Sequence, residues 1–479
     1  MFITSFGEQN ITYKCCSNFL IHLCNAAIFA GAGLSASLGF VNWKELLRDL
    51  ADDLNLDIDK ETDLVSIAQY HSNKFNRTRI NEKIINEFTT LEKGSENHQI
   101  LSRLDIDTYW TTNYDQLIEK TLENNGKKVD KKVTNEDFSR YIKKKDATVY
   151  KMHGDKDAPH NAVLTKNDYE DYHDSRELFS TVLRGDLLSK VFLFIGFSFD
   201  DPNIDYILSR IRILLKDNTP KHYCFFKEID KNSFSDDQDY LYAKIRQDLK
   251  IEDLMRYGIH AVLVEDYPVI TKILKVIENR VKRKNIFISG AAENYEPFGK
   301  EKAEKLIFKL SYKLAEKNYK IISGYGLGIG SLVINGALDF KLNSAYRNLD
   351  DLLILRPFPQ INPTAEKNTK YREEMISQAG IALFFFGNKK NDVSDTIVDS
   401  KGMIEEFDLC VKNNVIPIPI GITGFVSKKL WEKVNKDFSQ YYPENSDFID
   451  TLKEINNADV SSDDLISNIL KAISLLQKV

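Results

Sequence analysis

The chain has 479 residues, of which 42% are hydrophobic, and 65 basic against 71 acidic side chains give it a formal net charge of −6. This length predicts two to four domains of roughly 150 residues each. A mildly acidic chain is a poor candidate for sequence-independent binding of nucleic acid, so no nucleic-acid partner is expected.

The five cysteines form no CxxC pair, and their odd number argues against a disulfide framework and a four-thiolate zinc site. Reduced thiols in the cytoplasm are the simpler interpretation. The first residues lack a basic head followed by a long apolar run, and no stretch of 18 apolar residues occurs. We therefore expect no signal peptide, no membrane span and a cytoplasmic location.

Residues 1–25 are predicted to form a helical lead-in to the first glycine-rich turn. The apolar run Ala26–Ala30 meets Gly31-Ala32-Gly33 and then small residues, which predicts a buried parallel strand, a tight turn and a helix start. Such a turn directs backbone N–H groups and a helix dipole at one point, where a pyrophosphate fits. A tight turn that binds nothing is the alternative, because GxGxxG is incomplete at Ala36.

Helices are predicted to follow the turn. Asn42, with Glu45 three residues later, predicts a capping box for a helix from Trp43 to about Leu54. Residues 62–103 are charged and periodic, which predicts several further helices.

Polar side chains then follow three predicted strands. The strand from Thr108 ends at Asn113 and Asp115, where a helix from Tyr114 to Leu122 is expected. The strand from Ala147 ends at His153. In parallel α/β sheets ligands bind at the edge where strands end and helices begin, so these side chains are candidate site residues.

The third strand, from Val191, ends at Gly196 and Ser198, and Asp201 with Pro202 predicts the start of a helix. Strands at 222–226 and 259–264 close the predicted sheet, and a helix runs from about 268 to 280. The basic run at 281–285 marks the predicted boundary between domains 1–283 and 284–479.

The second domain repeats the alternation of strand and helix. The strand at Ile286–Gly290, the helix at Lys300–Lys317 and the strand from Lys320 into the turn Gly324–Gly330 open it. The remaining predicted strands are 352–356, 381–386 and 415–419, and the remaining predicted helices include 364–378, 402–413 and 461–479. The fold class is therefore α/β, with two Rossmann-like parallel-sheet domains.

Four motifs carry a resemblance: GAGLS at 31–35, TTNYD at 111–115, MHGD at 152–155 and GFSFDDPN at 196–203. In order and spacing they resemble the sirtuin NAD-binding domain, in its bacterial defence-associated branch, over roughly residues 20–275. The resemblance implies that NAD is bound as a substrate by Ala30, Gly31, Ala32, Gly33, Ser35, Asn113, Asp115, His153, Gly196 and Ser198.

The chain also departs from the sirtuin deacylases. It lacks the two zinc-binding cysteine pairs, and Phe40-Val41-Asn42-Trp43 replaces the usual Pro-x-Phe-Arg. Neither zinc nor another metal is therefore expected, and a helical insert is expected in place of the zinc module. The resemblance then implies hydrolysis of the nicotinamide glycosidic bond. His153 would be the base towards a ribose hydroxyl or water, and Asn113 would position the ribose hydroxyls or the water. Asp115 would orient its neighbours or cap its helix.

The second domain resembles the SLOG family of nucleotide-processing and nucleotide-sensing proteins, on its two glycine-rich turns at 289–291 and 324–330. Gly402-Met-Ile-Glu-Glu-Phe resembles a degraded Gly-Gly-x-Gly-Thr-x-x-Glu motif of phosphoribohydrolases. Loss of hydrolysis with retention of nucleotide binding is the natural inference.

As a whole the chain resembles the NAD hydrolase effectors of the Thoeris anti-phage defence system, through KMHGD, FLFIGFSF, SGYGLGIGS and LILRPFPQ. That resemblance implies activation by a cyclic ADP-ribose isomer, made by a TIR-domain partner protein, and homo-oligomers such as a tetramer. The implied activator contacts are Gly290, Ala291, Leu327, Phe358, Arg372, Lys389, Gly402 and Glu406.

Three other functions remain open at this point. The chain could be a non-catalytic nucleotide-binding module that signals by assembly, which the joint presence of Asn113 and His153 disfavours. A deacylase is disfavoured by the absent zinc cysteines. A phosphoribohydrolase in the second domain is disfavoured by the broken glycine-threonine motif.

Overall fold

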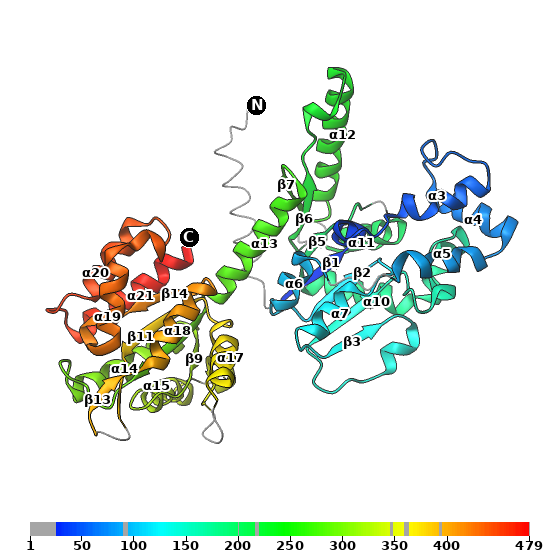
Figure 1. Ribbon diagram of the computed structural model, residues 1–479. Helices are drawn as coiled ribbons and strands as arrows, with labels where there is room; N and C mark the ends of the chain where they lie inside the picture. The colour runs from blue at the N-terminus through cyan, green and yellow to red at the C-terminus, as the bar shows by residue number, and fades with distance from the viewer. Residues whose placement is uncertain are drawn as a thin grey trace. The chain divides into compact units, whose positions relative to one another are not determined.

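The computed structural model describes residues 25–89, 94–199, 201–215, 220–344, 348–358, 364–391 and 395–478. The chain divides into two compact units, Met1–Glu278 and Asn279–Val479, coloured blue to green and green to red in Figure 1. The helical lead-in predicted for residues 1–25 lies almost wholly outside the described residues.

The first unit is built on a seven-stranded sheet in the order β3-β4-β2-β1-β5-β6-β7, in which all neighbours pair in parallel. The strands are β1 (Ala26–Ala30), β2 (Thr108–Thr111), β3 (Val129–Lys132), β4 (Ala147–Lys151), β5 (Val191–Ile195), β6 (His222–Lys227) and β7 (Ile259–Val264). The chain proceeds from β1 to one side and then returns with β5 to the other side. The order of strands therefore reverses at β1, where ligands bind in sheets of this kind.

The central strand β1 is buried along its whole length, as expected for an apolar run in a parallel sheet covered on both faces. Phe29 packs against Phe194 with ring centroids 5.2 Å apart, and both belong to a core that includes Trp110. This core holds the carboxyl ends of β1, β2 and β5 rigidly beside one another.

The first unit contains the helices α2 (Ala32–Ser35), α3 (Trp43–Asp53), α4 (Leu64–Phe75), α5 (Thr78–Phe88), α6 (Glu96–Arg103), α7 (Leu117–Asn124), α8 (Lys166–Glu170), α9 (Tyr172–Ser175), α10 (Glu177–Ser189), α11 (Pro202–Leu215) and α12 (Asp237–Met255). Helix α13 (Tyr267–Lys282) begins in the first unit and ends in the second. Helices α3, α4 and α5 form a helical insert, whose hydrophobic cluster also includes Tyr114, Leu117, Ala162 and Leu164. The predicted N-cap is confirmed, because Asn42 Oδ1 accepts from the Glu45 amide at 2.9 Å. The Glu45 carboxylate instead pairs with Arg48, so the reciprocal half of the predicted capping box is not made.

One predicted helix start in this unit needs correction, and one strand was missed. Helix α7 begins at Leu117 rather than Tyr114, because the Asp115 side chain accepts from the Leu117 amide at 3.0 Å and holds the preceding residues in a turn. Strand β3 was not predicted, because three of its four residues, Asp130, Lys131 and Lys132, are charged.

The second unit is built on a five-stranded parallel sheet in the order β10-β9-β8-β11-β14. Its strands are β8 (Asn285–Ala291), β9 (Lys320–Ser323), β10 (Leu353–Leu355), β11 (Ile381–Phe386) and β14 (Ile416–Pro419), and β12 (Asn388–Lys390) pairs antiparallel with β13 (Ile397–Asp399). Its helices are α14 (Lys300–Glu316), α15 (Gly330–Leu342), α16 (Leu349–Leu352), α17 (Ala365–Ile376), α18 (Lys401–Lys412), α19 (Phe425–Lys436), α20 (Ser446–Ile455) and α21 (Ser462–Lys478). Here the strand order reverses at β8.

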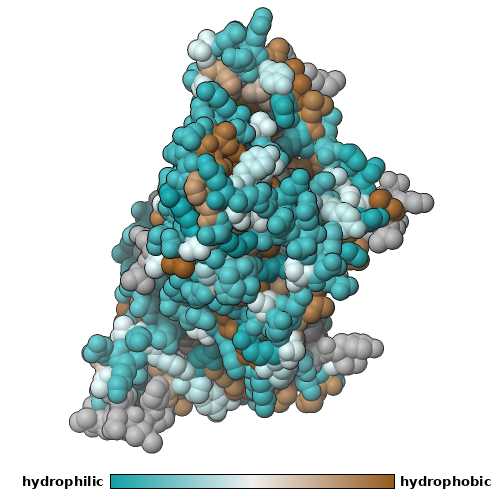
Figure 2. All heavy atoms as spheres, turned by 90° about the vertical axis from the view of Figure 1, so that its right-hand side faces the viewer, coloured by the Kyte–Doolittle hydropathy of each residue, from teal (hydrophilic) through white to brown (hydrophobic). Residues whose placement is uncertain are grey.

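The predicted fold class is confirmed, since both units are α/β with wholly parallel main sheets. No helix among the described residues is long and apolar enough to cross a membrane. The face drawn in Figure 2 is mostly hydrophilic, and its hydrophobic groups are scattered in small patches.

Candidate active site and nucleotide site

A cavity of about 610 Å³ opens at the carboxyl ends of the strands where the first sheet reverses its order. Its size lies within the range typical of small-molecule sites. Eight predicted site residues line it: Ala32, Gly33, Ser35, Asn113, Asp115, His153, Gly196 and Ser198. Side chains that follow β1, β2, β4 and β5 therefore meet in one cavity, as the strand ends predicted.

Two predicted residues lie just behind this cavity. Ala30 is the buried last residue of β1, and Gly31 is the N-cap of α2. Neither is among the described lining residues, but the Gly31 carbonyl accepts a hydrogen bond from Asn113. Gly31 therefore contributes to the site through its backbone carbonyl, and Ala30 is the last residue of the strand that precedes the turn.

The glycines of the turn pack against the turn that follows β5. A Cβ on Gly31 would lie 2.4 Å from the Gly196 oxygen, and one on Gly196 would lie 2.2 Å from the Leu34 nitrogen. The Gly31 and Gly33 amides donate to the carbonyls of Ile195 and Gly196 at 3.0 and 2.9 Å. The glycines thus allow two backbones to meet, and two of the N–H groups expected to hold a phosphate are already used within the protein.

Asn113 connects the strand ends around the cavity. Its Nδ2 donates to the Gly31 carbonyl at 3.1 Å and to Ser35 Oγ at 3.4 Å, and its own amide donates to Thr111 Oγ1 at 2.9 Å. These contacts fix the orientation of the side-chain amide. Its Oδ1, a hydrogen-bond acceptor, therefore points away from Gly31 and Ser35, the partners of Nδ2.

Asp115 accepts hydrogen bonds on both of its carboxylate oxygens. Its Oδ1 accepts from the Leu117 amide at 3.0 Å and so holds the turn before α7, whose N-cap is Gln116. Its Oδ2 accepts from Ser35 Oγ at 2.9 Å. Because Ser35 in turn contacts Asn113, the carboxylate orients the cavity residues as well as this turn.

His153 is buried beside Asp201, with Nε2 of the ring 3.1 Å from Oδ2 of the carboxylate. This is an ion-pair distance, although the direction of the ring gives Nε2 no hydrogen bond among the described residues. The Tyr169 hydroxyl donates to the same Oδ2 at 3.3 Å. Burial tends to raise the pKa of Asp201, but His153 and the amides of Asn203 and Ile204 outweigh it and lower the pKa.

Asp201 is a functional candidate that the sequence identified only as an N-cap. The structure confirms the cap, because Oδ1 accepts from the amides of Asn203 and Ile204 at 2.9 and 3.2 Å. Its second oxygen lies beside a histidine 48 positions earlier in the chain (201 − 153 = 48). The signal in the sequence was the place of Asp201 in GFSFDDPN, a motif already assigned to the cavity.

The helical insert supplies a wall of the cavity that the motifs did not indicate. Trp43, Lys44, Asp63 and Leu64 line it, together with Phe40, which precedes α3. The insert thus forms part of the wall of the cavity at the strand ends.

A second cavity, of about 270 Å³, opens where the second sheet reverses its order. Six of the predicted activator residues line or close it: Gly290, Ala291, Phe358, Arg372, Gly402 and Glu406. The two glycine turns meet here, since a Cβ on Gly326 would lie 1.9 Å from the Gly290 oxygen. Leu327 is 56% exposed and Lys389 is exposed, and neither is among the described lining residues of this cavity.

Charges in the second cavity are paired with one another. Glu406 accepts from Ser289 Oγ at 2.6 Å and lies 3.5 Å from Nε of Arg372. The Arg372 guanidinium also pairs with Glu405 at 2.9 Å and lies 4.7 Å from the Phe358 ring centroid. Burial raises the pKa of Glu406, against the lowering effects of Ser289 and Arg372. The site presents a cation, an aromatic face and a carboxyl group, which suit phosphate, base and ribose hydroxyl respectively.

Comparison with known families agrees with this architecture. The model of the SIR2-like domain matches residues 107–251, and that of the Sir2- and TIR-associating SLOG family matches residues 269–476. The fold and the two cavities therefore define a protein that joins a SIR2-like domain to a SLOG domain.

Three similar proteins are each named NAD(+) hydrolase ThsA. They come from Cytobacillus dafuensis (45% identical over 469 residues, 95% of this chain and 94% of the relative), Acinetobacter baumannii strain 532279 (46% over 462, 94% and 96%) and Bacillus cereus strain MSX-D12 (45% over 455, 94% and 95%). The chain belongs to the ThsA family of NAD(+) hydrolases.

Proposed function

We propose that this chain hydrolyses NAD to ADP-ribose and nicotinamide in the cavity of the first unit. The observation that carries the proposal is the meeting of Asn113 and His153 on one cavity with the Gly33 turn. The names of the relatives support the same substrate and reaction. NAD is the substrate in this reaction, and the proposal includes neither a cofactor nor zinc.

The proposed reaction breaks the bond between C1′ of the ribose and the nicotinamide nitrogen, and the bonding electrons leave with nicotinamide. The oxygen of a water molecule forms the new bond to C1′, and its proton passes to the imidazole of His153, on the ring nitrogen that does not face Asp201. General-base help of this kind contributes roughly 10²- to 10⁴-fold to the rate. Oδ1 of Asn113 would accept from a ribose hydroxyl or from the attacking water, which fixes its position.

Asp201 would stabilise the charge that His153 acquires. A carboxylate 3.1 Å from the ring favours the protonated imidazole once it has taken up the proton. The hydrogen bonds that Oδ1 makes to the start of α11 keep the carboxylate in place during this step.

For the second unit we propose a sensor for a cyclic ADP-ribose isomer made by a TIR-domain partner. The description of the matching SLOG family as TIR-associating supports this partner. In this proposal Gly290, Ala291 and Glu406 hold ribose and phosphate, and Arg372 with Phe358 holds phosphate and base. Leu327, Lys389 and Gly402 would complete the contacts, with Leu327 and Lys389 approaching from outside the cavity.

The proposed biological role is that of a cytoplasmic anti-phage effector that depletes NAD as a homo-oligomer, with a tetramer as its expected form. Such an enzyme must be inactive until it is triggered, so the ligand must prefer the active state. Shifting the ratio of active to inactive protein from 1:99 to 99:1 takes a roughly 10⁴-fold difference in affinity between the two states.

Nicotinamide release from NAD by the full chain, with and without cyclic ADP-ribose and its linkage isomers, tests the activity and its regulation. Turnover that one isomer raises supports both parts. NAD that remains intact with every isomer favours the alternative of a non-catalytic module that signals by assembly.

A further inference from the structure

The motif that carries His153 also carries a buried cation that the proposed reaction does not use. Lys151 is the last residue of β4 and its side chain is fully buried. It is not among the described lining residues of the NAD cavity, whereas His153, two residues later, is. A buried ammonium is costly unless it is fully paired, so its surroundings are informative.

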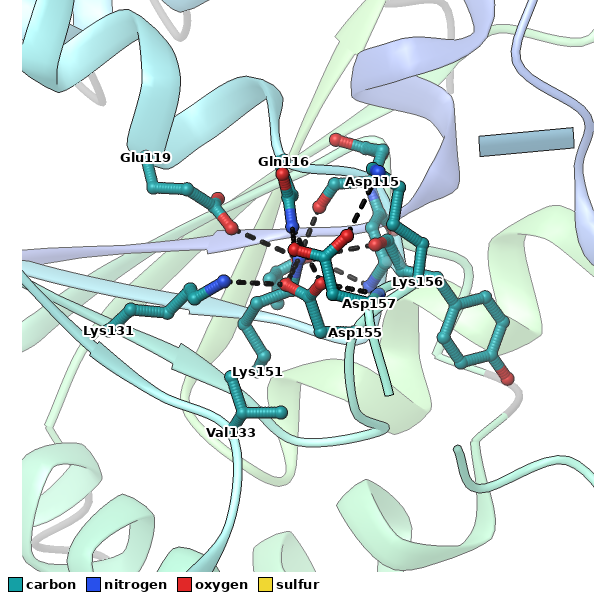
Figure 3. Close-up of polar contacts among 12 residues, drawn as sticks. Asp115, Gln116, Glu119, Lys131, Val133, Lys151, Asp155, Lys156 and Asp157 are labelled. Atoms are coloured by element: carbon teal, nitrogen blue, oxygen red, sulfur yellow. Dashed lines mark hydrogen bonds and ion pairs between the residues drawn. The ribbon is translucent and has the colours of Figure 1, made fainter. Parts of the chain in front are cut away.

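Lys151 contacts two carboxyl groups from different elements. Its Nζ lies 2.9 Å from Asp155 Oδ2 and 3.2 Å from Glu119 Oε1 on α7, as Figure 3 shows. Burial disfavours the ionised form of Asp155, but Lys151, the Asp157 amide and Lys131 together outweigh it and hold the pKa of Asp155 at about 2. Burial raises the pKa of Glu119, whose Oε2 has no hydrogen-bond partner among the described residues. Asp155, whose carboxylate oxygen lies nearer to Nζ and whose pKa is lowered, is therefore a counterion of Lys151.

Lys151 also donates to the backbone of the loop that follows β2. Its Nζ donates to the carbonyl of Tyr114 at 3.3 Å and to that of Asp115. These two carbonyls come directly after Asn113 in the chain, and Asp115 is the residue that orients Ser35. The ammonium thus fixes the backbone on which the amide of Asn113 depends.

The same network connects this loop to the one that carries His153. Gln116 Nε2 donates to Asp155 Oδ1 at 2.7 Å, and the Lys156 amide donates to the Tyr114 carbonyl at 3.1 Å. Lys131 on β3 lies 3.3 Å from Asp155 Oδ2 and adds a second cation to the network, also drawn in Figure 3. One buried ion network therefore joins segments 113–117 and 151–157, each of which holds one candidate catalytic residue.

We propose that Lys151 is a positioning residue that sets the placement of Asn113 relative to His153, with Asp155 as its counterion. The proposal rests on the proposed hydrolysis of NAD in the first cavity. Lys151 acts behind the cavity by holding the two strand-end loops in one arrangement. Small displacements of reacting groups can cost about 100-fold in rate, so the loss should fall on turnover.

Lys151→Met is the principal variant, and Lys132→Met is its matched control. Lys132 is also buried, lies 3.0 Å from Asp130, and donates to the carbonyls of Asp137 and Arg140 at 2.5 and 3.1 Å. Its contacts are confined to the neighbourhood of β3. Both variants remove a buried ammonium, but only Lys151→Met releases the loop of Asn113.

The expected result is a split between kcat and KM for NAD hydrolysis by the full chain. We expect Lys151→Met to lower kcat about 100-fold with KM changed by about twofold or less, and Lys132→Met to retain kcat. A wild-type kcat in Lys151→Met, or an equal loss in Lys132→Met, would overturn the proposal. If Lys151→Met does not fold, Gln116→Leu provides a milder variant. Gln116 is half-buried and donates to Asp155, so its replacement should also lower kcat.

Hydrogen exchange of the full chain gives a readout that does not depend on turnover. Amides of residues 113–117 should exchange faster in Lys151→Met and Gln116→Leu than in the wild type, and at the wild-type rate in Lys132→Met. Unchanged exchange in that segment would overturn the inference even in an active enzyme. Absence of NAD hydrolysis by the wild type with every cyclic ADP-ribose isomer would instead contradict the proposed function.

Discussion

Nε2 of His153 and Oδ2 of Asp201 lie 3.1 Å apart at the edge of the first cavity, and both side chains are at least nine-tenths buried. The carboxylate is held by the start of α11, and the imidazole follows the end of β4. A base and a charge partner are thus brought together by two separate strand-to-helix turns of one sheet.

Asp201→Asn should lower kcat for NAD hydrolysis by about 10- to 100-fold, because it removes the charge that stabilises protonated His153. The fold should survive, since an asparagine oxygen can still cap α11. Steady-state kinetics test this, with Tyr169→Phe as control, because it removes the hydroxyl from the same Oδ2 and leaves the charge. Equal kcat in Asp201→Asn and the wild type would contradict the assignment.

Glu119→Gln should become more stable relative to the wild type as pH rises. Burial raises the pKa of Glu119 above its ordinary 4.5, so the folded state binds this proton more tightly than the unfolded state. The stability that the proton contributes is therefore fully present below about pH 4.5 and is lost as pH rises through the folded-state pKa. Denaturant unfolding of both proteins across this range measures the difference, and a difference that does not vary with pH would refute the prediction.

Gly196→Ala should destabilise the first unit far more than Gly126→Ala. Both glycines have positive φ, +64° and +78°, but a Cβ on Gly196 would lie 2.2 Å from the Leu34 nitrogen, whereas one on Gly126 would meet nothing within 4 Å. Gly126→Ala should cost about 1 to 2 kcal/mol for its conformation alone. Gly196→Ala adds a backbone collision at the cavity, and chemical unfolding that showed equal losses would argue against this packing.

Arg372→Ala should abolish binding of the activating cyclic ADP-ribose isomer to the full chain, because its partly buried guanidinium is a cation that lines the second cavity. Glu405→Gln should instead strengthen binding, since Glu405 competes with a phosphate for Arg372 at 2.9 Å. Isothermal titration measures both. Unchanged affinity in Arg372→Ala would move the ligand away from this cavity.

The sequence predicted the strand ends well, because apolar runs followed by glycine or polar residues have few other interpretations in a parallel sheet. Asn113, His153 and Gly196 therefore converge as expected. The predicted use of the glycines was less accurate. The Gly31 turn packs against Gly196, a contact between two segments of the chain that the local pattern around Gly31 does not contain.

Contacts between side chains from different elements around the sheet could not be predicted from the sequence either. The sequence predicts only that Asp201 caps a helix. Its distance from His153 depends on the packing of α11 against the sheet. Lys151 reads as a charged residue at a strand end, and its burial depends on carboxyl groups from α7 and the following loop. Strand β3 was missed because most of its residues are charged. In the folded chain these charges are stabilised by one another and by neighbouring carbonyls, which the local sequence does not reveal.

The most direct test of the account is nicotinamide release from NAD by the full-length wild type, Asn113→Ala and His153→Ala, each with and without the activating cyclic ADP-ribose isomer. The account predicts that only the wild type releases nicotinamide at an appreciable rate, and that the isomer raises this rate. Equal turnover in the wild type and both variants would contradict it.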